Sequence, residues 1–148
     1  MIADESLERW VQLERRLEAA PDRVYRAWTD PEELPRWLPY GLEGSLAVGA
    51  RSTLIWPDRR VWWEVLEADP GQSLVARHAQ LPDDATIATL SLRIQPRGMG
   101  SRLVLRDGPF SAEPAGTDAW AAAIEGWVEA VTLLRAYLDF SVDLRARW

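Results

Sequence analysis

Cysteine and lysine are absent from this 148-residue sequence, and histidine occurs only once, as His78. Without cysteine the chain can form no disulfide, no thiolate metal site and no cysteine nucleophile. A single histidine also excludes the zinc sites that are built from several histidines. We therefore expect neither a metal nor a cofactor.

Basic charge is scarce as well. All 17 basic residues are arginines, and they stand against 23 acidic residues, which gives a formal net charge of −6. The arginine pairs at 15–16 and 59–60 are isolated, and no basic block stands out. Nucleic-acid binding usually needs such a block, so we expect no nucleic-acid partner.

Long apolar runs and export signals are also missing. No stretch reaches ~18 uninterrupted apolar residues, and residues 1–6 contain no charged region followed by an apolar run. These patterns predict a cytoplasmic protein without membrane insertion. Signatures of nucleophilic catalysis and phosphate binding are lacking too, because the sequence has neither Gly-x-Ser-x-Gly nor Gly-Lys-Ser.

What remains predicts one α+β domain over residues 1–148. A first strand ends at Ala20, and Pro21 opens a short helix at a position where its missing N–H costs nothing. Apolar residues at i, i+3 and i+4 mark the buried side of that helix. A second short helix follows and carries Leu34 and Trp37.

Turns rich in glycine and proline separate the further strands, and such short connections favour antiparallel hairpins. The strands are expected near 43–47, 51–57, 61–68, 73–80, 86–95 and 101–107. From about Thr117 to Leu138 the apolar residues recur with helical spacing. This last helix would span roughly 33 Å at 1.5 Å per residue, long enough to lie across a curved sheet.

Four segments of the chain resemble a known family in their order and spacing. Their shared residues are Ala20, Pro21, Val24, Ala27, Trp28, Thr29, Asp30, Pro31, Leu34 and Trp37; Leu66, Glu67, Asp69, Pro70, Leu74 and Val75; Leu103, Leu105, Asp107 and Phe110; and Gly126, Trp127, Val131 and Leu134. In these motifs the chain resembles the START-like, or SRPBCC, superfamily, and within it the branch named for the activator of the heat-shock-protein-90 ATPase. The resemblance implies a helix-grip fold, with a seven-stranded curved antiparallel sheet around a long C-terminal helix and two short helices after the first strand.

The turn positions also predict which residues face each other across the sheet. The expected pairs are Leu54 with Trp63, Trp63 with His78, His78 with Ala88, and Leu90 with Asp107. Directly opposed residues share a face, so Trp63, His78 and Asp107 are predicted to point towards the long helix. The opposite, solvated face should carry Arg77, Thr89, Ser91, Arg93, Arg102 and Arg106.

Nine tryptophans are far more than so small a domain ordinarily contains. Plain core packing explains any single one of them equally well. Indoles are also large, rigid and apolar, with one N–H that can orient a guest, so together they could line an aromatic cavity. The resemblance favours this second interpretation, because it implies a container between sheet and helix. The predicted ligand-binding residues are Trp37, Trp56, Trp63, His78, Asp107, Trp120, Ile124 and Trp127. Trp62 falls on the outer face and is predicted to be a surface residue or a contact for a partner.

His78 and Asp107 are the notable polar residues of the inner face. A lone buried histidine is more often a satisfied core residue than a catalyst. At ~4.8 Å per strand the two residues lie on the order of 10–12 Å apart, too far for a direct hydrogen bond. They could instead hold opposite ends of one ligand, with Arg15 as a partner for Asp107. The resemblance puts a histidine at the position of Asp107 in many relatives, so their histidine-dependent chemistry is not expected here.

Gly126 lies in the middle of the predicted long helix, where glycine costs roughly 1 kcal/mol relative to alanine. Either close packing of the helix on the sheet or space for a ligand beside Trp127 would explain it. Both explanations put Gly126 close to other groups, so Gly126→Ala is predicted not to stabilise the protein.

The leading functional hypothesis is non-catalytic binding of a small hydrophobic molecule, aromatic or polycyclic. Sequestration, carriage or self-resistance to a secondary metabolite fits what the resemblance implies. The first alternative is an enzyme of the polyketide cyclase/aromatase kind, which shares the fold and would use His78 or Asp107 to move protons. The second alternative is a co-chaperone that contacts a chaperone and stimulates its ATPase.

Overall fold

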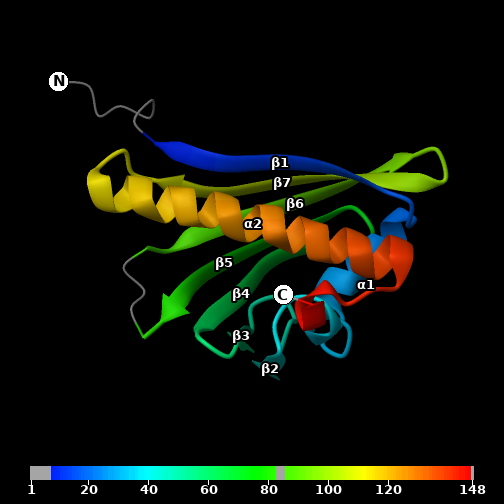
Figure 1. Cartoon of the computed structure of the whole chain (residues 1–148), viewed down its shortest axis with the longest axis horizontal. Helices are drawn as coiled ribbons and strands as arrows, with labels where there is room; N and C mark the ends of the chain where they lie inside the picture. Colours follow the sequence, from blue (N-terminus) through cyan, green and yellow to red (C-terminus); the bar gives the residue numbers. More distant parts are fainter. Residues whose placement is uncertain (1–7, 83–85, 148) are drawn as a thin grey trace.

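Seven antiparallel strands form one sheet in the order β1-β7-β6-β5-β4-β3-β2, and a long helix, α2, lies across it (Figure 1). The structure is a computed structural model and describes residues 8–82 and 86–147. The strands are β1 Arg9–Leu17, β2 Gly41–Gly44, β3 Arg51–Ile55, β4 Arg60–Asp69, β5 Ser73–Leu81, β6 Ala88–Arg97 and β7 Gly100–Phe110. The helices are α1 Pro21–Thr29, η2 Leu34–Arg36, α2 Pro114–Phe140 and η3 Leu144–Arg147, where η marks a 3-10 helix. The predicted α+β helix-grip fold is confirmed.

The two short segments after β1 differ in kind. The first is the predicted α-helix, which begins at Pro21 and buries Val24 and Trp28. The second is only a three-residue 3-10 helix, η2. Pro35 lies within η2, and Pro31 and Pro39 lie on either side of it. Together they remove N–H donors that a longer helix would need.

The predicted register holds through the part of the sheet that carries the inner polar residues. Trp63 pairs with His78, His78 with Ala88, and Leu90 with Asp107. The pairing of Leu54 with Trp63 is wrong: Leu54 pairs with Val61, since the β3–β4 turn is centred one residue earlier than expected. A shift of two in the pairing preserves parity, so the prediction of the face still holds.

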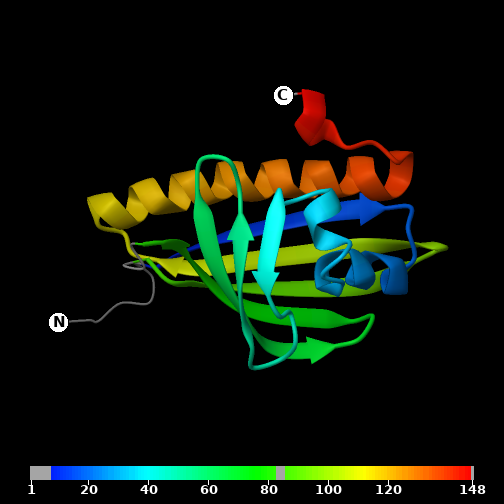
Figure 2. The same cartoon turned by 90° about the horizontal axis from the view of Figure 1, so that it is seen from below.

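α2 is anchored to the sheet by its C-terminal half. Its fully buried residues are Ala130, Val131, Leu133, Leu134 and Ala136. Near the same end, the carboxylate of Asp139 accepts the backbone N–H of Glu18 at 3.0 Å. The N-terminal half, residues 114–129, buries no side chain completely. In Figure 2 the sheet curls beneath the helix, so that β2 and β3 run steeply across the direction of β6 and β7.

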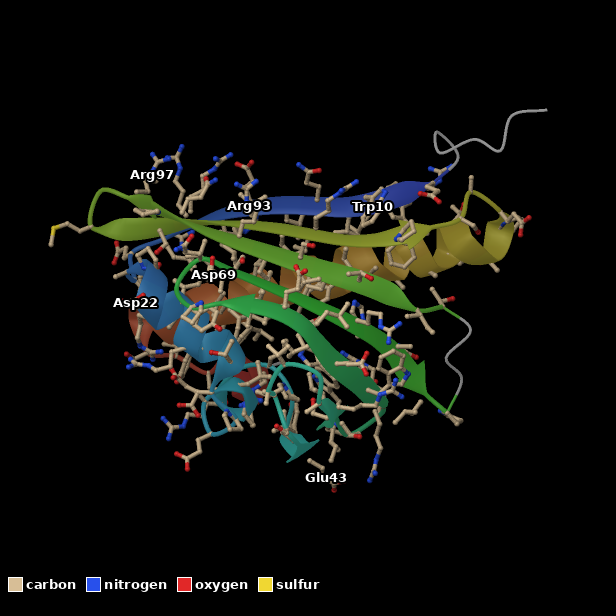
Figure 3. The ribbon with its side chains drawn as sticks, turned by 180° about the vertical axis from the view of Figure 1, so that it is seen from behind. Trp10, Asp22, Glu43, Asp69, Arg93 and Arg97 are labelled. Atoms are coloured by element: carbon tan, nitrogen blue, oxygen red, sulfur yellow. The ribbon has the colours of Figure 1, made fainter. Side chains whose placement is uncertain are left out.

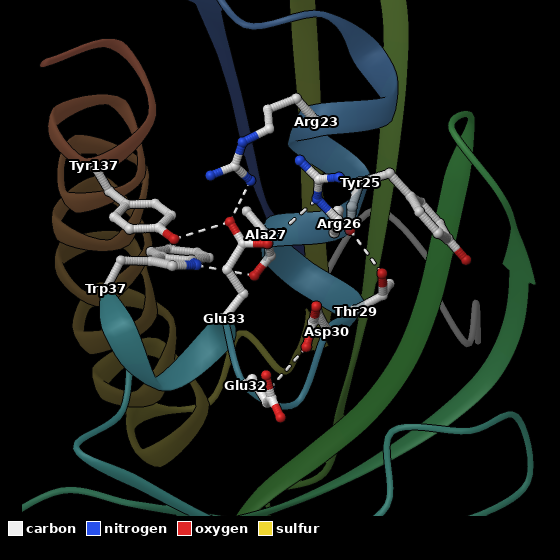
Figure 4. Close-up of polar contacts among 10 residues, drawn as sticks. All are labelled: Arg23, Tyr25, Arg26, Ala27, Thr29, Asp30, Glu32, Glu33, Trp37 and Tyr137. Carbon is white, nitrogen blue, oxygen red and sulfur yellow. Dashed lines mark hydrogen bonds and ion pairs between the residues drawn. The ribbon is translucent and has the colours of Figure 1, made fainter. Parts of the chain in front are cut away.

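A buried carboxylate joins α1 and η2 to the C-terminal half of α2 (Figure 4). Glu33 is 6 % exposed; it pairs with Arg23 and, at 3.5 Å, with Arg26. The hydroxyl of Tyr137 on α2 donates to the same carboxylate at 2.9 Å. Burial alone would lower the pKa of Arg23, but its interactions with Tyr137 and Glu33 raise that pKa above the ordinary value.

The sheet face opposite α2 is the arginine-rich face that the register predicted. Figure 3 shows Arg93, Arg97 and Trp10 projecting from it. Trp62 also belongs to this face, yet the prediction that it is a surface residue is wrong, because only 4 % of it is exposed. The guanidinium of Arg51 lies 4.2 Å from the centre of its ring and covers it. Among the described residues, no helix is both long and apolar enough to cross a membrane.

Candidate functional site

Asp107 lies at the centre of a polar cluster between the sheet and α2. Its side chain points inward from β7 and is completely buried. One carboxylate oxygen, Oδ1, lies 2.7 Å from Nε2 of His78 on β5. The other, Oδ2, accepts a hydrogen bond of 2.7 Å from Nε1 of Trp127 on α2. The carboxylate therefore links two strands of the sheet to the helix that covers them.

The direct contact between His78 and Asp107 overturns the expectation that they are too far apart to bond. The backbone geometry behind that expectation is right, since β6 separates β5 from β7. The inner face of the sheet is concave, however, so side chains that cross above β6 converge while their backbones stay apart. Ala88, the partner of His78 on β6, is too small to stand between them.

Arg15 was one candidate partner of Asp107, provided that the first and last strands pair; they do pair, but the candidate is wrong. The residue opposite Asp107 on β1 is Val11, whereas Arg15 lies opposite Leu103. The Arg15 guanidinium instead donates to the backbone carbonyl of Glu14. In its place, Trp127 supplies the second donor to Asp107.

Tryptophan rings surround the His78–Asp107 pair. The ring of Trp63 lies 5.8 Å from that of His78, and the ring of Trp127 stands nearly perpendicular to His78 at 5.7 Å. Trp28 of α1 extends the cluster, with its ring 6.4 Å from Trp127. Trp37 packs edge-on against Trp28 at 4.8 Å and donates its N–H to the carbonyl of Ala27. These residues form one continuous aromatic group.

Two of these indoles have no hydrogen-bond partner. The N–H groups of Trp28 and Trp63 are buried and, within the described residues, meet no acceptor. Trp28 and Trp63 are only 1 % and 3 % exposed, so bulk water cannot readily accept hydrogen bonds from their N–H groups. Trp62 has a third unpartnered N–H, but on the outer side of the sheet. Buried donors without an acceptor are uncommon in native proteins and need a reason.

Three of the predicted ligand-binding residues lie outside this cluster. Trp56 follows the end of β3, half-buried, with Arg59 over its ring at 4.4 Å. Trp120 donates its N–H to the carbonyl of Trp10 at 3.1 Å and is thereby tied to β1. Ile124 is half-buried on the side of α2 that borders a cleft.

Clefts are found beside the cluster rather than within it. One, of about 430 Å³, runs along α2 and is lined by Ile124, Glu125, Val128, Glu129 and Thr132. The other, of about 440 Å³, is lined by Tyr25, Thr29, Pro31, Gly44, Ser45, Leu46, Ala47, Val48, Ala68 and Leu74. Burial, with a smaller contribution from Asp69, raises the pKa of Tyr25 in this second cleft. Neither cleft is lined by His78 or Asp107.

Gly126 lies in α2 as predicted, but its surroundings differ from those expected. The position is exposed, and a Cβ added there would meet nothing within 4 Å. The expectation of close packing or of ligand space at Gly126 is therefore wrong. Trp127, the next residue, turns inward because neighbouring helix positions are rotated by about 100°.

Trp28 is the member of the cluster that the sequence did not single out for binding. In the sequence it stood out only as an apolar residue on the buried side of the first short helix and as one of the residues shared with the family. A signal was present, since a tryptophan on a short helix that immediately follows the first strand must pack against the sheet or against α2. Among residues 8–82 and 86–147, no three histidine, cysteine or acidic side chains gather closely enough to hold a metal ion.

The fold and the family are now settled by comparison with known proteins. The family model for Activator of Hsp90 ATPase homolog 1-like protein matches residues 18–139. The chain belongs to this family. That match confirms the START-like resemblance, and it covers the elements from α1 to α2 except for the last residue of α2. No curated protein matches the chain.

Solved structures with the same fold share little sequence with this family member. Protein MLL2253 from Mesorhizobium loti is 24 % identical, with a TM-score of 0.79 over 90 % of this chain and 99 % of that one. The Aha1 dimer from Colwellia psychrerythraea is 16 % identical, with a TM-score of 0.77 over 88 % and 96 %. DynU16, a putative protein in the dynemicin biosynthetic locus, is 23 % identical, with a TM-score of 0.76 over 88 % of this chain and 47 % of its own. The chain thus spans about half the length of DynU16.

Proposed function

We propose that this protein binds a small hydrophobic, aromatic molecule between the concave face of the sheet and the N-terminal half of α2. One observation carries the proposal: three tryptophans surround a buried, hydrogen-bonded polar pair, and two of their N–H groups lack an acceptor. An aromatic guest would stack on the rings, and its polar atoms would serve the free donors.

The packing of α2 supports a route into this interior. The C-terminal half is held by Val131, Leu134 and the contact of Tyr137 with Glu33. The N-terminal half has only half-buried residues facing the sheet, including Trp120 and Trp127. Lifting this half separates the half-buried residues Trp120, Ile124 and Trp127 from the core, and a ligand of sufficient apolar area can offset that cost. Binding in this interior then requires the N-terminal half of α2 to move.

The biological role proposed is sequestration, carriage or self-resistance to a secondary metabolite. DynU16 shares the fold and belongs to the dynemicin biosynthetic locus, which supports a ligand of this kind. A contact with a chaperone is also proposed, because the matching family is described by activation of the Hsp90 ATPase. Stimulation of a purified chaperone ATPase by this protein would separate that role from binding of small molecules.

One observation favours the cyclase or aromatase alternative. His78 is hydrogen-bonded to a fully buried carboxylate, an arrangement that orients the imidazole and supports its use as a base. Recovery of the ligand unchanged after prolonged incubation supports carriage. Appearance of a cyclised product that depends on His78 supports the enzyme.

Calorimetry with tryptophan fluorescence tests the binding proposal. The ligands are aromatic polyketides, flavones and coumarins, with fatty acids as a non-aromatic comparison. We expect one-to-one binding near micromolar Kd, about −8 kcal/mol, with quenching of tryptophan emission. Trp127→Phe should weaken binding by about 1–2 kcal/mol, since it loses ring area and the N–H that bonds Asp107.

The matched control is Trp10→Phe, on the opposite side of the sheet. It makes the same chemical change and should leave the affinity unaltered. Absence of binding below about millimolar Kd for every ligand, or an equal loss in both variants, would count against the interior site.

A further inference from the structure

The two nitrogens of the His78 ring have different surroundings. Nε2 faces Oδ1 of Asp107 at 2.7 Å, and an ionised carboxylate can only accept, so Nε2 carries the proton. Nδ1 then presents a lone pair, and no described residue donates to it. His78 is also the one polar member of the cluster that is not fully buried, with 17 % of its side chain exposed. The imidazole thus offers one free proton acceptor on its accessible side, where a ligand can reach it.

Asp107 is already satisfied and is not itself available to a ligand. Oδ1 is occupied by His78, and Oδ2 accepts from Trp127 at 2.7 Å. Because the carboxylate is completely buried, its charge acts in a medium of low dielectric constant and is little screened. A proton arriving on Nδ1 would make an imidazolium that faces this charge directly.

Free donors lie next to the free acceptor. The Trp63 ring is 5.8 Å from His78, and its buried N–H has no partner among the described residues. Trp28, whose N–H is also unpartnered, contacts Trp127 from the other side at 6.4 Å. Within the described residues, the cluster therefore supplies neither a donor for Nδ1 nor an acceptor for the two indole N–H groups.

We propose that the ligand is recognised through an acidic hydroxyl, a phenol or an enol, which gives its proton to Nδ1 of His78. This inference rests on the binding site proposed above. In the step, the ligand O–H bond breaks, its electron pair stays on the oxygen, and a new N–H bond forms on His78. The imidazolium is neutralised by Asp107, and the ligand oxyanion accepts hydrogen bonds from the imidazolium and the indole N–H of Trp63.

Other ligand groups satisfy only part of the cluster. A ketone or ether oxygen accepts from an indole but has no hydrogen for Nδ1. A carboxylate arrives already ionised, so it has no proton to give and adds a second negative charge beside Asp107. An ammonium group can donate to Nδ1 but leaves the indole donors without an acceptor. A hydroxyl meets both needs from a single atom, and an acidic hydroxyl, unlike an ordinary alcohol, can also pass its proton to the imidazole.

The test compares hydroxylated ligands with their methyl ethers. The probes are 7-hydroxyflavone with 7-methoxyflavone, and 7-hydroxycoumarin with 7-methoxycoumarin. We expect the hydroxyl form to bind roughly tenfold more tightly or better, as for a hydrogen bond to a charged group. Its absorption band should move on binding to the position of the phenolate at a pH where the free ligand is neutral.

His78→Gln provides the matched variant, because its amide can still donate to Asp107 but has no basic nitrogen. It should lose the preference for the hydroxyl forms over the methoxy forms and produce no phenolate band, whatever the change in its affinity for the methoxy forms. Equal binding of both forms without a band shift overturns this inference and leaves the proposed function intact. Failure of every probe to bind overturns the proposed function, and this inference with it. The wild-type spectrum decides the matter even if the variant does not fold.

Discussion

At the scale of single residues, Asp107 is the most constrained group in the molecule. A carboxylate with no exposed surface survives in a protein only when hydrogen bonds replace its lost hydration. Asp107 meets this condition with two donors from different elements, His78 on β5 and Trp127 on α2. The same residue therefore serves the packing of α2 and the orientation of the imidazole.

Replacing Asp107 should test that dual role. Asp107→Asn keeps the size but replaces two charge-assisted hydrogen bonds by neutral ones, and its amide N–H can face His78 only if the imidazole adopts the other tautomer. We expect the free energy of unfolding to fall by about 1–3 kcal/mol, measured by urea denaturation. Asp58→Asn, in an exposed turn, is the control and should cost almost nothing. If the two variants are equally stable, Asp107 does not anchor the helix.

Gly126 gives a prediction of the opposite sign. Because a Cβ at this exposed helical position meets nothing within 4 Å, Gly126→Ala should stabilise the protein by about 0.5–1 kcal/mol. Gly108→Ala is the counterpart: its Cβ would meet the Trp10 ring at 2.9 Å, at a backbone φ of +153°, so it should destabilise. Thermal unfolding measures both, and a lowered midpoint for Gly126→Ala would show a contact that the structure lacks.

The sequence predicts which face of the sheet a side chain lies on, but not which other side chains it contacts. Strand parity correctly turned His78 and Asp107 inward, because parity depends only on turn positions. Whether they touch depends on sheet curvature and rotamers, which no spacing rule contains. Trp62 was likewise given the right face but the wrong exposure, since the covering side chain comes from Arg51 on the adjacent strand β3.

At the scale of elements, the two halves of α2 have different tasks. The C-terminal half packs on the sheet and on α1 and η2, and it holds the domain together. The N-terminal half carries Trp120 and Trp127 and makes its closest contacts through indole N–H groups. A helix that is firmly held at one end can move at the other without unfolding the domain.

The junction at Glu33 should therefore contribute measurably to stability. Tyr137→Phe removes the hydroxyl that donates to the buried Glu33 carboxylate, and we expect a loss of about 1 kcal/mol in the free energy of unfolding. Tyr40→Phe, at an exposed position, serves as the control. Chemical denaturation of both variants measures the difference, and equal stabilities would mean that the hydroxyl contributes nothing.

The C-terminal η3 should respond to acid. The hydrogen bond from Arg145 lowers the pKa of Asp143 below its ordinary value of 3.8. Since the folded-state pKa is the lower one, this contribution to stability is present above pH 3.8 and is lost as the pH falls through the lowered value. Arg145 also donates to the carbonyl of Pro39, so its release should loosen η3. The NMR signal of the Arg145 amide, followed from pH 6 to pH 2, should shift in this range; a signal unchanged below pH 3.8 would contradict the assignment.

The helices and strands were predicted correctly where glycine and proline mark the turns between them. Glycine and proline turns mark nearly every strand boundary, and α2 was found within a few residues of both ends. The prediction failed at η2, where a tryptophan and a leucine at helical spacing suggested a longer helix. The closely spaced prolines limit that segment to one turn.

At the scale of the whole molecule, the fold is readable from sequence because it depends on order and spacing. Four motifs in the right succession fix the strand order and the long final helix, and the family match over 18–139 agrees with them. The binding interior is less readable. It depends on which tryptophans contact one another. Trp56 instead lies half-buried after the end of β3, and Trp120 donates a hydrogen bond to β1.

The central claim is that an aromatic ligand enters between the sheet and the N-terminal half of α2, and indole NMR tests it most directly. Each tryptophan gives one N–H signal, which can be assigned by single substitution to phenylalanine. On titration with 7-hydroxyflavone, the signals of Trp28, Trp63 and Trp127 should shift, the first two as their unpartnered N–H groups gain an acceptor. Those of Trp10 and Trp62, on the outer side of the sheet, should stay in place. Shifts confined to Trp10 and Trp62 would contradict the account and place the ligand on the outer face.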